Sequence, residues 1–255
     1  MIKISIITIC KNAQNVIEKT LESVFMQTYP HIEYIVIDGA STDNTRAVIE
    51  RYRDKISQIV SEPDHGIYDA MNKGIAHATG DVLQFLNAGD ALHDPSVIAN
   101  IVTAFDKNPA SDIIYGKPVF ENIPEDMKQH ALEYQTGPKT MMDWMLTPAC
   151  HQAIFIKRSV FDKIGLYKTT YRLSGDVEFF LRCFSRKIPM HYIDRNIVFY
   201  HYQGASLANV SISNRERLKA IRTHATPYQL FRYTIKVLKR RIKRLARQQQ
   251  RGGGT

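Results

Sequence analysis

Three carboxylates in the first half of the chain are well placed to do chemistry. Asp38, Asp64 and Asp90 each follow a short apolar run. Carboxylate oxygens are the ligands that Mg²⁺ and Mn²⁺ prefer, and such a cation commonly bridges protein carboxylates to the phosphates of a substrate. An acid after an apolar run can also simply cap the next helix. The cation and cap interpretations are therefore both open for any one of the three.

A second acidic group stands much later in the chain. Asp176 and Glu178 begin the periodic segment 176–184, where the N-terminus of a helix stabilises a charged carboxylate. A carboxylate within hydrogen-bond reach of a substrate hydroxyl can act as a general base. His151 and His201 lie among apolar residues, where a histidine is either a packed rim residue or a ligand. A helix cap is the structural alternative for Asp176.

Several motifs are absent from the sequence, and their absence removes whole classes of enzyme. No GxGxxG follows the first apolar run, and no GxxxxGK[ST], HExxH or GxSxG occurs. These absences argue against dinucleotide oxidoreductases, P-loop NTPases, zinc proteases and serine hydrolases. Cys10, Cys150 and Cys183 form no CxxC pair and suggest neither a zinc ribbon nor a disulfide framework. A nucleotide diphosphate held through a metal remains the simplest ligand.

Alternating strands and helices must position these residues. Apolar, β-branched runs predict strands at 4–9, 34–38, 56–60, 82–86 and 113–115, and helical spacing predicts helices at 16–25, 46–52, 69–78 and 95–105. This order predicts an α/β fold with a mostly parallel central sheet and helices on both faces. Ligands of such sheets bind at the carboxyl ends of the strands. That edge would gather Thr8, Lys11, Asp38, Asp64 and Asp90.

The second half is less regular. Residues 116–150 contain four prolines and predict a loop-rich insertion with an edge strand and a short helix at 141–145. A strand and then a helix are expected over 155–164, a helix over 176–184 and a strand over 197–202.

Composition indicates a globular body with a basic appendage. The chain has 255 residues, of which 44% are hydrophobic and 23% are charged, and its net charge is +9. From residue 215 onward there are 13 Lys or Arg and one acid, so the first 214 residues are mildly acidic. No apolar run approaches the roughly 20 residues of a membrane span, and the N-terminus is typical of a strand. We therefore expect a cytoplasmic protein.

The basic appendage has helical periodicity. Phe231, Ile235, Leu238, Ile242 and Leu245 recur at a spacing of four and three, with Lys and Arg between them. This pattern is typical of a helix in the interface of an anionic membrane. The stripe could instead pack on the body or on a second subunit, or the helix could bind nucleic acid. We favour the membrane and expect no nucleic acid, with a domain at 1–212, a basic helical tail at 213–250 and a disordered end at 251–255.

An ordered set of motifs over about residues 1–207 resembles the family 2 glycosyltransferases of bacterial surface-polysaccharide synthesis, which have a GT-A fold. The matching pieces are SIITICKN at 5–12, LESVFMQTY at 21–29, EYIVIDGASTD at 33–43, EPDHGIYDAMNKG at 62–74, LNAGD at 86–90, CHQ at 150–152, GLY at 165–167 and GD at 175–176.

The resemblance implies a hexosyltransferase-type enzyme that transfers a sugar from a nucleotide-diphosphate donor to a saccharide acceptor, which we expect to be lipid-linked, with inversion at the anomeric carbon. The protein would then be peripheral on the inner face of the cell membrane. The resemblance assigns the general base to Asp176. It also assigns a divalent Mn²⁺ or Mg²⁺ to Asp90, helped by His201. The nucleotide would be bound by Thr8, Lys11, Asp38, Asp64, Lys73 and Asn87. The acceptor side would include His151, Glu178 and Arg182.

Three positions depart from the family pattern. Gly39 replaces the second acid of the DDGS stretch, Gly89 replaces the first acid of the metal-binding pair, and Met71 replaces a common arginine. Lys73 is then the expected cation for the phosphates. Gly39 and Gly89 keep one alternative open, a non-catalytic protein with a nucleotide-sugar fold. The basic tail keeps a second alternative open, a basic nucleic-acid-binding protein.

Overall fold

The structure is a computed structural model that describes residues 1–124, 137–138, 140–201 and 209–252, without the side chains of 241 and 243–252. The first half forms a parallel sheet with strand order β3-β2-β1-β4. The strands are β1 (Ile4–Cys10), β2 (Ile32–Asp38), β3 (Gln58–Ser61) and β4 (Val82–Phe85). They alternate with α1 (Ile17–Phe25), α2 (Thr45–Glu50), a 3₁₀ turn (Arg53–Lys55), α3 (Ile67–His77) and α4 (Val97–Lys107).

The second half extends the same sheet on the β4 side, in the order β7-β6-β8-β5. These strands are β5 (Ala91–Leu92), β6 (Ile113–Glu121), β7 (Ile154–Lys157) and β8 (Met190–His201). β7 runs antiparallel to both β4 and β6, and β5 runs antiparallel to β8. The shorter elements are α6 (Met141–Leu146), a 3₁₀ turn (His151–Ala153), α7 (Arg158–Ile164) and α8 (Gly175–Ser185).

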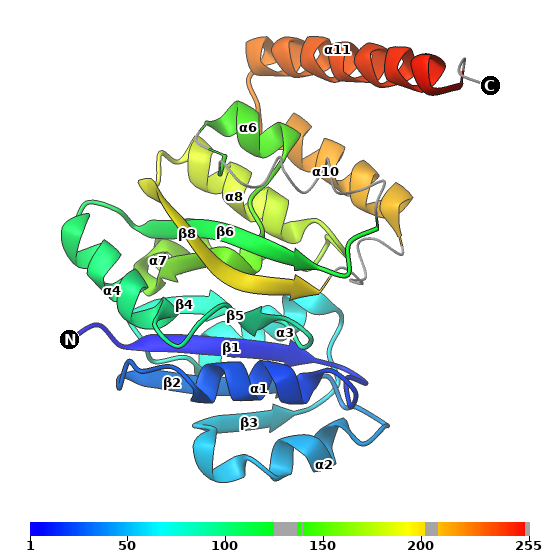
Figure 1. Ribbon diagram of the computed structural model, residues 1–255. Helices are drawn as coiled ribbons and strands as arrows, with labels where there is room; N and C mark the ends of the chain where they lie inside the picture. Colours follow the sequence, from blue (N-terminus) through cyan, green and yellow to red (C-terminus); the bar gives the residue numbers. More distant parts are fainter. Residues whose placement is uncertain (125–136, 139, 202–208, 253–255) are drawn as a thin grey trace.

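The sheet is buried on both faces, as predicted. Successive side chains of a strand point to opposite faces, and β1 shows the result: Ile4 and Ile6 join one apolar cluster, whereas Ile7 and Ile9 join the other. Helices cover both faces of the sheet (Figure 1). The prediction of a mostly parallel α/β sheet is therefore confirmed, with β5 and β7 as its antiparallel members.

The region predicted as a loop-rich insertion contains more strand than expected. β6 continues through Pro118 to Glu121, paired in parallel with β8 across two register shifts. β8 is also longer than the expected strand and begins at Met190. Sequence periodicity missed these extensions because both segments are only partly buried and lack a continuous apolar run. Tyr202, predicted as the end of the strand, lies outside the described residues.

Two helices follow the sheet. α10 (Val210–His224) packs on α8 and places Ala220 and Ile221 in the apolar core. The structure therefore moves the expected boundary: residues through 224 pack with the body, so the tail does not begin at 213. α11 (Pro227–Gly252) then lies at one end of the molecule, beyond α6 and α10 (Figure 1). The helix includes the first two residues of the expected disordered end, and 253–255 lie outside the described residues.

No helix in the described ranges combines the length and the apolar character that a membrane crossing needs.

Candidate functional site

Thr8 on β1 and Asp38 at the end of β2 both have fully buried side chains. The Thr8 hydroxyl and the Tyr34 hydroxyl lie 2.9 Å apart. The Asp38 carboxylate accepts hydrogen bonds from the Ser61 hydroxyl, at 2.6 Å, and from the backbone N–H and hydroxyl of Ser41. We expected Thr8 and Asp38 to line a nucleotide pocket; in the structure both are buried, Thr8 against Tyr34 of the neighbouring strand and Asp38 against Ser61 and the loop residue Ser41.

Asp64 comes closest to the edge position that Gly39 leaves open. A side chain at residue 39 would place its first carbon 2.0 Å from Asp64 Oδ2 and 3.3 Å from the Lys11 side chain. Asp64 Oδ1 accepts the backbone N–H of Gly66 at 2.9 Å. Only glycine leaves room for this carboxylate, so the acid missing from the strand β2 motif is supplied from the end of β3.

Lys73 is engaged by the chain itself. Its ammonium pairs with Glu62 at 2.8 Å and Asp69 at 3.4 Å, and donates to the Pro63 carbonyl at 2.6 Å. An ammonium has three donors, and these contacts use all of them. We expected Lys73 to bind phosphate; the structure instead shows it holding the loop that carries Asp64. The Lys11 side chain stands beside that loop and is exposed.

The turn after β4 explains the second departure from the family motif. Gly89 has φ = +100°, a backbone conformation that residues with a side chain rarely adopt. The buried hydroxyl of Thr20, from α1, accepts the Gly89 N–H at 2.9 Å and donates to the Asp90 carbonyl at 2.7 Å. Glycine at 89 thus belongs to the turn that presents Asp90.

Asp90 is 4% exposed, and a protein donor meets each of its oxygens. The backbone N–H of His201 donates to Oδ1 and the Gln152 amide donates to Oδ2, both at 2.9 Å. Burial raises the pKa of Asp90 to about 6, against the lowering effect of these hydrogen bonds and of His151. The side-chain amide of Gln84 in turn donates to the backbone carbonyl of Gln152 at 2.8 Å.

His151 connects the Asp90 turn to helix α8. Its Nε2 lies 3.2 Å from the Asn87 amide nitrogen, and its Nδ1 lies 3.2 Å from Asp176 Oδ2. The imidazole therefore bridges the Asn87 amide and the Asp176 carboxylate. The carbonyl oxygen of the Asn87 side chain is buried and has no hydrogen-bond partner in the described part of the chain.

Asp176 sits in the first turn of α8, between two donors. The Tyr68 hydroxyl lies 2.9 Å from Oδ1, opposite the His151 contact on Oδ2. Burial acts to raise the pKa of Asp176, but hydrogen bonds from His151 and Tyr68 outweigh it and lower the pKa overall. The side chain is 20% exposed. Asp176 is therefore an accessible, charged carboxylate with a fixed orientation, as a general base requires.

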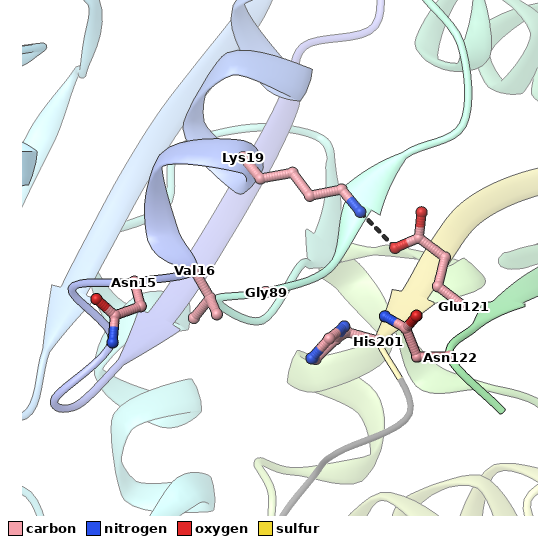
Figure 2. Close-up of a pocket in the computed structure, with 7 residues that line it drawn as sticks. All are labelled: Asn15, Val16, Lys19, Gly89, Glu121, Asn122 and His201. Atoms are coloured by element: carbon pink, nitrogen blue, oxygen red, sulfur yellow. Dashed lines mark hydrogen bonds and ion pairs between the residues drawn. The ribbon is translucent and has the colours of Figure 1, made fainter. Parts of the chain in front are cut away.

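A cleft of about 510 Å³ adjoins the Asp90 turn. Gly89 and Val16 stand on one side of it and His201 and Asn122 on another, and Lys19 reaches across to an ion pair with Glu121 (Figure 2). Asn15 completes the lining. His201 therefore lines the cleft, while its backbone N–H donates to Asp90.

A divalent cation at the Asp90 turn would have to arrive with its substrate. The described residues contain no group of three or more His, Cys, Asp or Glu side chains that could hold a metal unaided. Asp90 and His201 offer one carboxylate and one imidazole. Mg²⁺ bound with a nucleotide usually takes one or two carboxylates, the phosphates and several waters, and this donor set meets that need.

Two predicted residues lie elsewhere. The side chain of Glu178 is 0% exposed and pairs with Lys168 at 2.6 Å, Arg182 at 3.0 Å and His224 at 2.9 Å. Arg182 also donates to the Ile164 and Leu166 carbonyls. We expected both on the acceptor side; the structure buries Glu178 in an ionic cluster between helices. Helical geometry explains this, because Asp176 and Glu178 are two residues apart and point in different directions.

Sequence reasoning missed the residues that connect the site. Thr20, Tyr68 and Gln152 each contact a predicted residue, yet none carries a charge or stands at a strand end. Tyr68 and Gln152 lie inside quoted motifs, which was the available signal.

Comparisons with known proteins agree on one family. The model of "Glycosyl transferase family 2" matches residues 5–165. A PGL/p-HBAD biosynthesis glycosyltransferase of Mycobacterium bovis is 31% identical over 222 residues, covering 85% of this chain and 83% of the relative. An uncharacterized glycosyltransferase of Mycobacterium tuberculosis is 37% identical over 181 residues, covering 70% of this chain and 68% of the relative.

Solved structures share the fold. S. aureus TarS 1–349 in complex with UDP-GlcNAc superposes with a TM-score of 0.69 at 18% identity, over 88% of this chain and 65% of that chain. The mannosyltransferase PcManGT of Pyrobaculum calidifontis, in complex with GDP-Man and Mn²⁺, gives a TM-score of 0.68 at 20% identity, over 89% of this chain and 66% of that chain.

Proposed function

The chain belongs to glycosyltransferase family 2, and on this premise we propose that it is an inverting, hexosyltransferase-type enzyme acting on a saccharide acceptor. One observation supports the proposal most. The consecutive residues His151 and Gln152 contact Asp176 and Asp90, respectively. An acid suited to a metal-bound diphosphate and an acid suited to a general base thus stand on either side of one short turn.

The donor is a nucleotide-diphosphate sugar. Transfer of a sugar from such a donor is the common chemistry of the family, and the neighbours named above bind UDP-GlcNAc and GDP-Man. In this chain we assign donor contacts to Lys11 and Asp64, the accessible groups at the β1–β3 edge. Asp64 Oδ2 can accept an N–H from a nucleobase, and Lys11 can meet a phosphate. Asn87, between His151 and the Asp90 turn, completes the donor side.

Asp90 and His201 would hold a divalent Mn²⁺ or Mg²⁺, as the mannosyltransferase neighbour with bound Mn²⁺ suggests. When bound, the cation neutralises charge that develops on the departing diphosphate. Thr20 and Gln152 keep Asp90 aimed, because they fix its backbone and its carboxylate respectively.

Asp176 performs the proton transfer. The acceptor hydroxyl gives its proton to the Asp176 carboxylate while its oxygen forms a bond to the anomeric carbon. The bond between that carbon and the diphosphate oxygen breaks in the same step, and its electron pair leaves with the nucleotide diphosphate. Tyr68 and His151 orient the carboxylate through one hydrogen bond each. A single in-line displacement of this kind inverts the anomeric centre.

We propose a membrane location on the basis of helix α11. The predicted stripe is exposed: Phe231, Leu238 and Ile242 are 64%, 56% and 59% accessible, whereas Leu230 and Tyr233 pack toward the body. Ile235 is 36% accessible. The alternative that the stripe packs on the body of the same chain is therefore not what the structure has; Leu245 falls among the undescribed side chains. Lys and Arg flank the exposed stripe, which suits an anionic lipid surface and a lipid-linked acceptor.

A thermal-shift series tests the proposed function. UDP- and GDP-sugars, each with and without Mn²⁺, are added to the full chain. Binding to the folded state raises the melting temperature, so at least one donor should do so, and more strongly with Mn²⁺. The matched variant Asp90→Asn should lose most of the Mn²⁺-dependent part. No shift with any nucleotide sugar would contradict the assignment of the edge to a donor.

A further inference from the structure

Helix α10 contributes a carboxylate to the segment just before the catalytic helix. Glu216 Oε1 accepts the backbone N–H of Arg172 at 2.7 Å, and its Oε2 accepts those of Leu173 at 2.8 Å and Ser174 at 3.0 Å. Consecutive backbone N–H groups that converge in this way form an anion-binding nest. Here the anion is a side chain 42 residues later in the sequence than Ser174.

The start of α8 has no cap of its own. Ser174 is the N-cap residue, but its hydroxyl makes no capping bond to the helix. Instead it lies 3.0 Å from the carbonyl and 3.1 Å from the hydroxyl of Ser213 on α10. Both the backbone and the side chain of Ser174 are therefore held from α10, two residues before Asp176.

A second contact fixes α8 further along. His224, the last residue of α10, lies 2.9 Å from the buried Glu178 carboxylate. Glu178 is two residues after Asp176, so α10 contacts α8 both before and after the proposed base. Ala220 and Ile221 lie between Glu216 and His224 on α10; both are 0% exposed and belong to the core.

We infer that Glu216 is a positioning residue for sugar transfer: it holds the nest at 172–174 and thereby sets where α8 presents Asp176 to the acceptor. The inference rests on the proposed function, in which Asp176 is the base. Its consequence is that α10, although it lies within the basic C-terminal part of the sequence, completes the acceptor side of the site.

Glu216→Gln tests this role with little change in shape. An amide has only one acceptor oxygen, so the nest loses one of its two accepting atoms. The donor edge at β1–β4 is unaffected. Misplacement of a reacting group by about 1 Å can cost on the order of a hundredfold in rate. We therefore expect kcat, counted per donor-binding site, to fall at least about tenfold while the donor KM changes less than about twofold.

Two readouts separate positioning from general destabilisation. Titration with donor counts the folded sites, so a partly unfolded sample does not imitate a lower kcat. The acid limb of the pH–rate profile should also move to higher pH in Glu216→Gln, because a displaced Asp176 loses hydrogen bonds that lower its pKa. The titratable groups that interact with Asp176 are Tyr68, Tyr167, Cys150 and His151.

Controls make the result decisive. Glu50→Gln removes an exposed acid that pairs only locally with Arg53 and should leave kcat unchanged. If Glu216→Gln does not fold, Glu216→Asp, which keeps the charge and shortens the reach, is measured instead with the same expected direction. An unchanged kcat per site would overturn the positioning role. Transfer that survives in Asp176→Asn would instead overturn the proposed function, whatever Glu216 does.

Discussion

At the scale of single residues, Gly39 and Asp64 are best understood as one unit. Gly39 breaks the acidic motif of its strand, yet Asp64 Oδ2 occupies the space that a side chain there would need. The chain thus keeps a carboxylate at this edge, but it comes from the loop after β3. The departure does not favour a non-catalytic protein.

Gly39→Asp should therefore weaken donor binding. The new carboxylate would overlap Asp64 and displace it, so the donor would lose its contact with Asp64. A hydrogen bond to a charged group contributes about 1.5–3 kcal/mol, which corresponds to roughly a tenfold to hundredfold loss of affinity. Calorimetric titration of the donor measures it. The double variant Gly39→Asp, Asp64→Gly removes the overlap and should recover most of the affinity, with Asp64→Gly alone as control. A double variant no better than Gly39→Asp would contradict the shared-space account.

The sequence singled out the candidate acids but not their surroundings. Asp90 and Asp176 could be chosen because an acid after a strand and an acid in a first helical turn are visible patterns. Thr8, Asp38 and Lys73 could be selected from the motifs. Their partners Tyr34, Ser61 and Glu62 could not be found from sequence spacing. Whether a polar group faces a ligand or the protein depends on such tertiary contacts.

At the scale of elements, Glu33 fastens the amino-terminal edge of the sheet. From β2 it accepts hydrogen bonds from Ser5 on β1, from Lys3, and from both the N–H and the hydroxyl of Thr79 before β4. Burial acts to raise the pKa of Glu33, but these hydrogen bonds prevail and lower it to about 2. Three adjacent strands are thus joined opposite the functional edge.

This network predicts a pH dependence of stability. Because the folded-state pKa of Glu33 lies below its ordinary 4.5, its contribution is complete above about pH 4.5 and disappears as the pH falls toward about 2. The contribution is up to about 3 kcal/mol. Urea unfolding at pH 5 and pH 3 should show a smaller loss for Glu33→Gln than for the unmodified chain. An identical loss in both would contradict the network, and Glu50→Gln serves as the exposed control.

Element order was largely predictable, and strand direction was not. Apolar runs and helical spacing located β1, β2, β4, α1 and α4 to within a few residues. A strand was expected where β7 lies, but its antiparallel direction could not be foreseen, because direction depends on which neighbours pair. The two-residue β5 could not be foreseen at all, because a strand that short carries no periodicity.

At the scale of the whole molecule, the basic charge and the exposed apolar stripe lie together on α11, away from the functional edge of the sheet (Figure 1). The sequence indicated this helix, but not that α10 would belong to the body. The two segments look alike in charge; they differ in that α10 buries Ala220 and Ile221.

Replacing Ile235, Leu238 and Ile242 by Ser should abolish most binding to vesicles that contain phosphatidylserine. The apolar stripe would lose its affinity for the lipid interface, at about 0.8 kcal/mol for each CH₂ no longer buried. Vesicle co-sedimentation measures this binding.

A second variant, with Gln at Lys236, Lys239 and Arg240, should lower binding to anionic vesicles only, by about 1 kcal/mol for each charge. Undiminished vesicle binding by the Ser variant, or salt-sensitive capture of RNA in preference to vesicles, would contradict the membrane assignment.

The most direct test of the whole account is the rate of sugar transfer by Asp176→Asn at saturating donor and Mn²⁺. Asparagine keeps the shape but cannot take the acceptor's proton, and general-base catalysis contributes about 10²–10⁴ in rate. We predict a loss of that size with the donor Kd unchanged. Transfer within tenfold of the unmodified enzyme, at equal donor occupancy, would show that Asp176 is not the base.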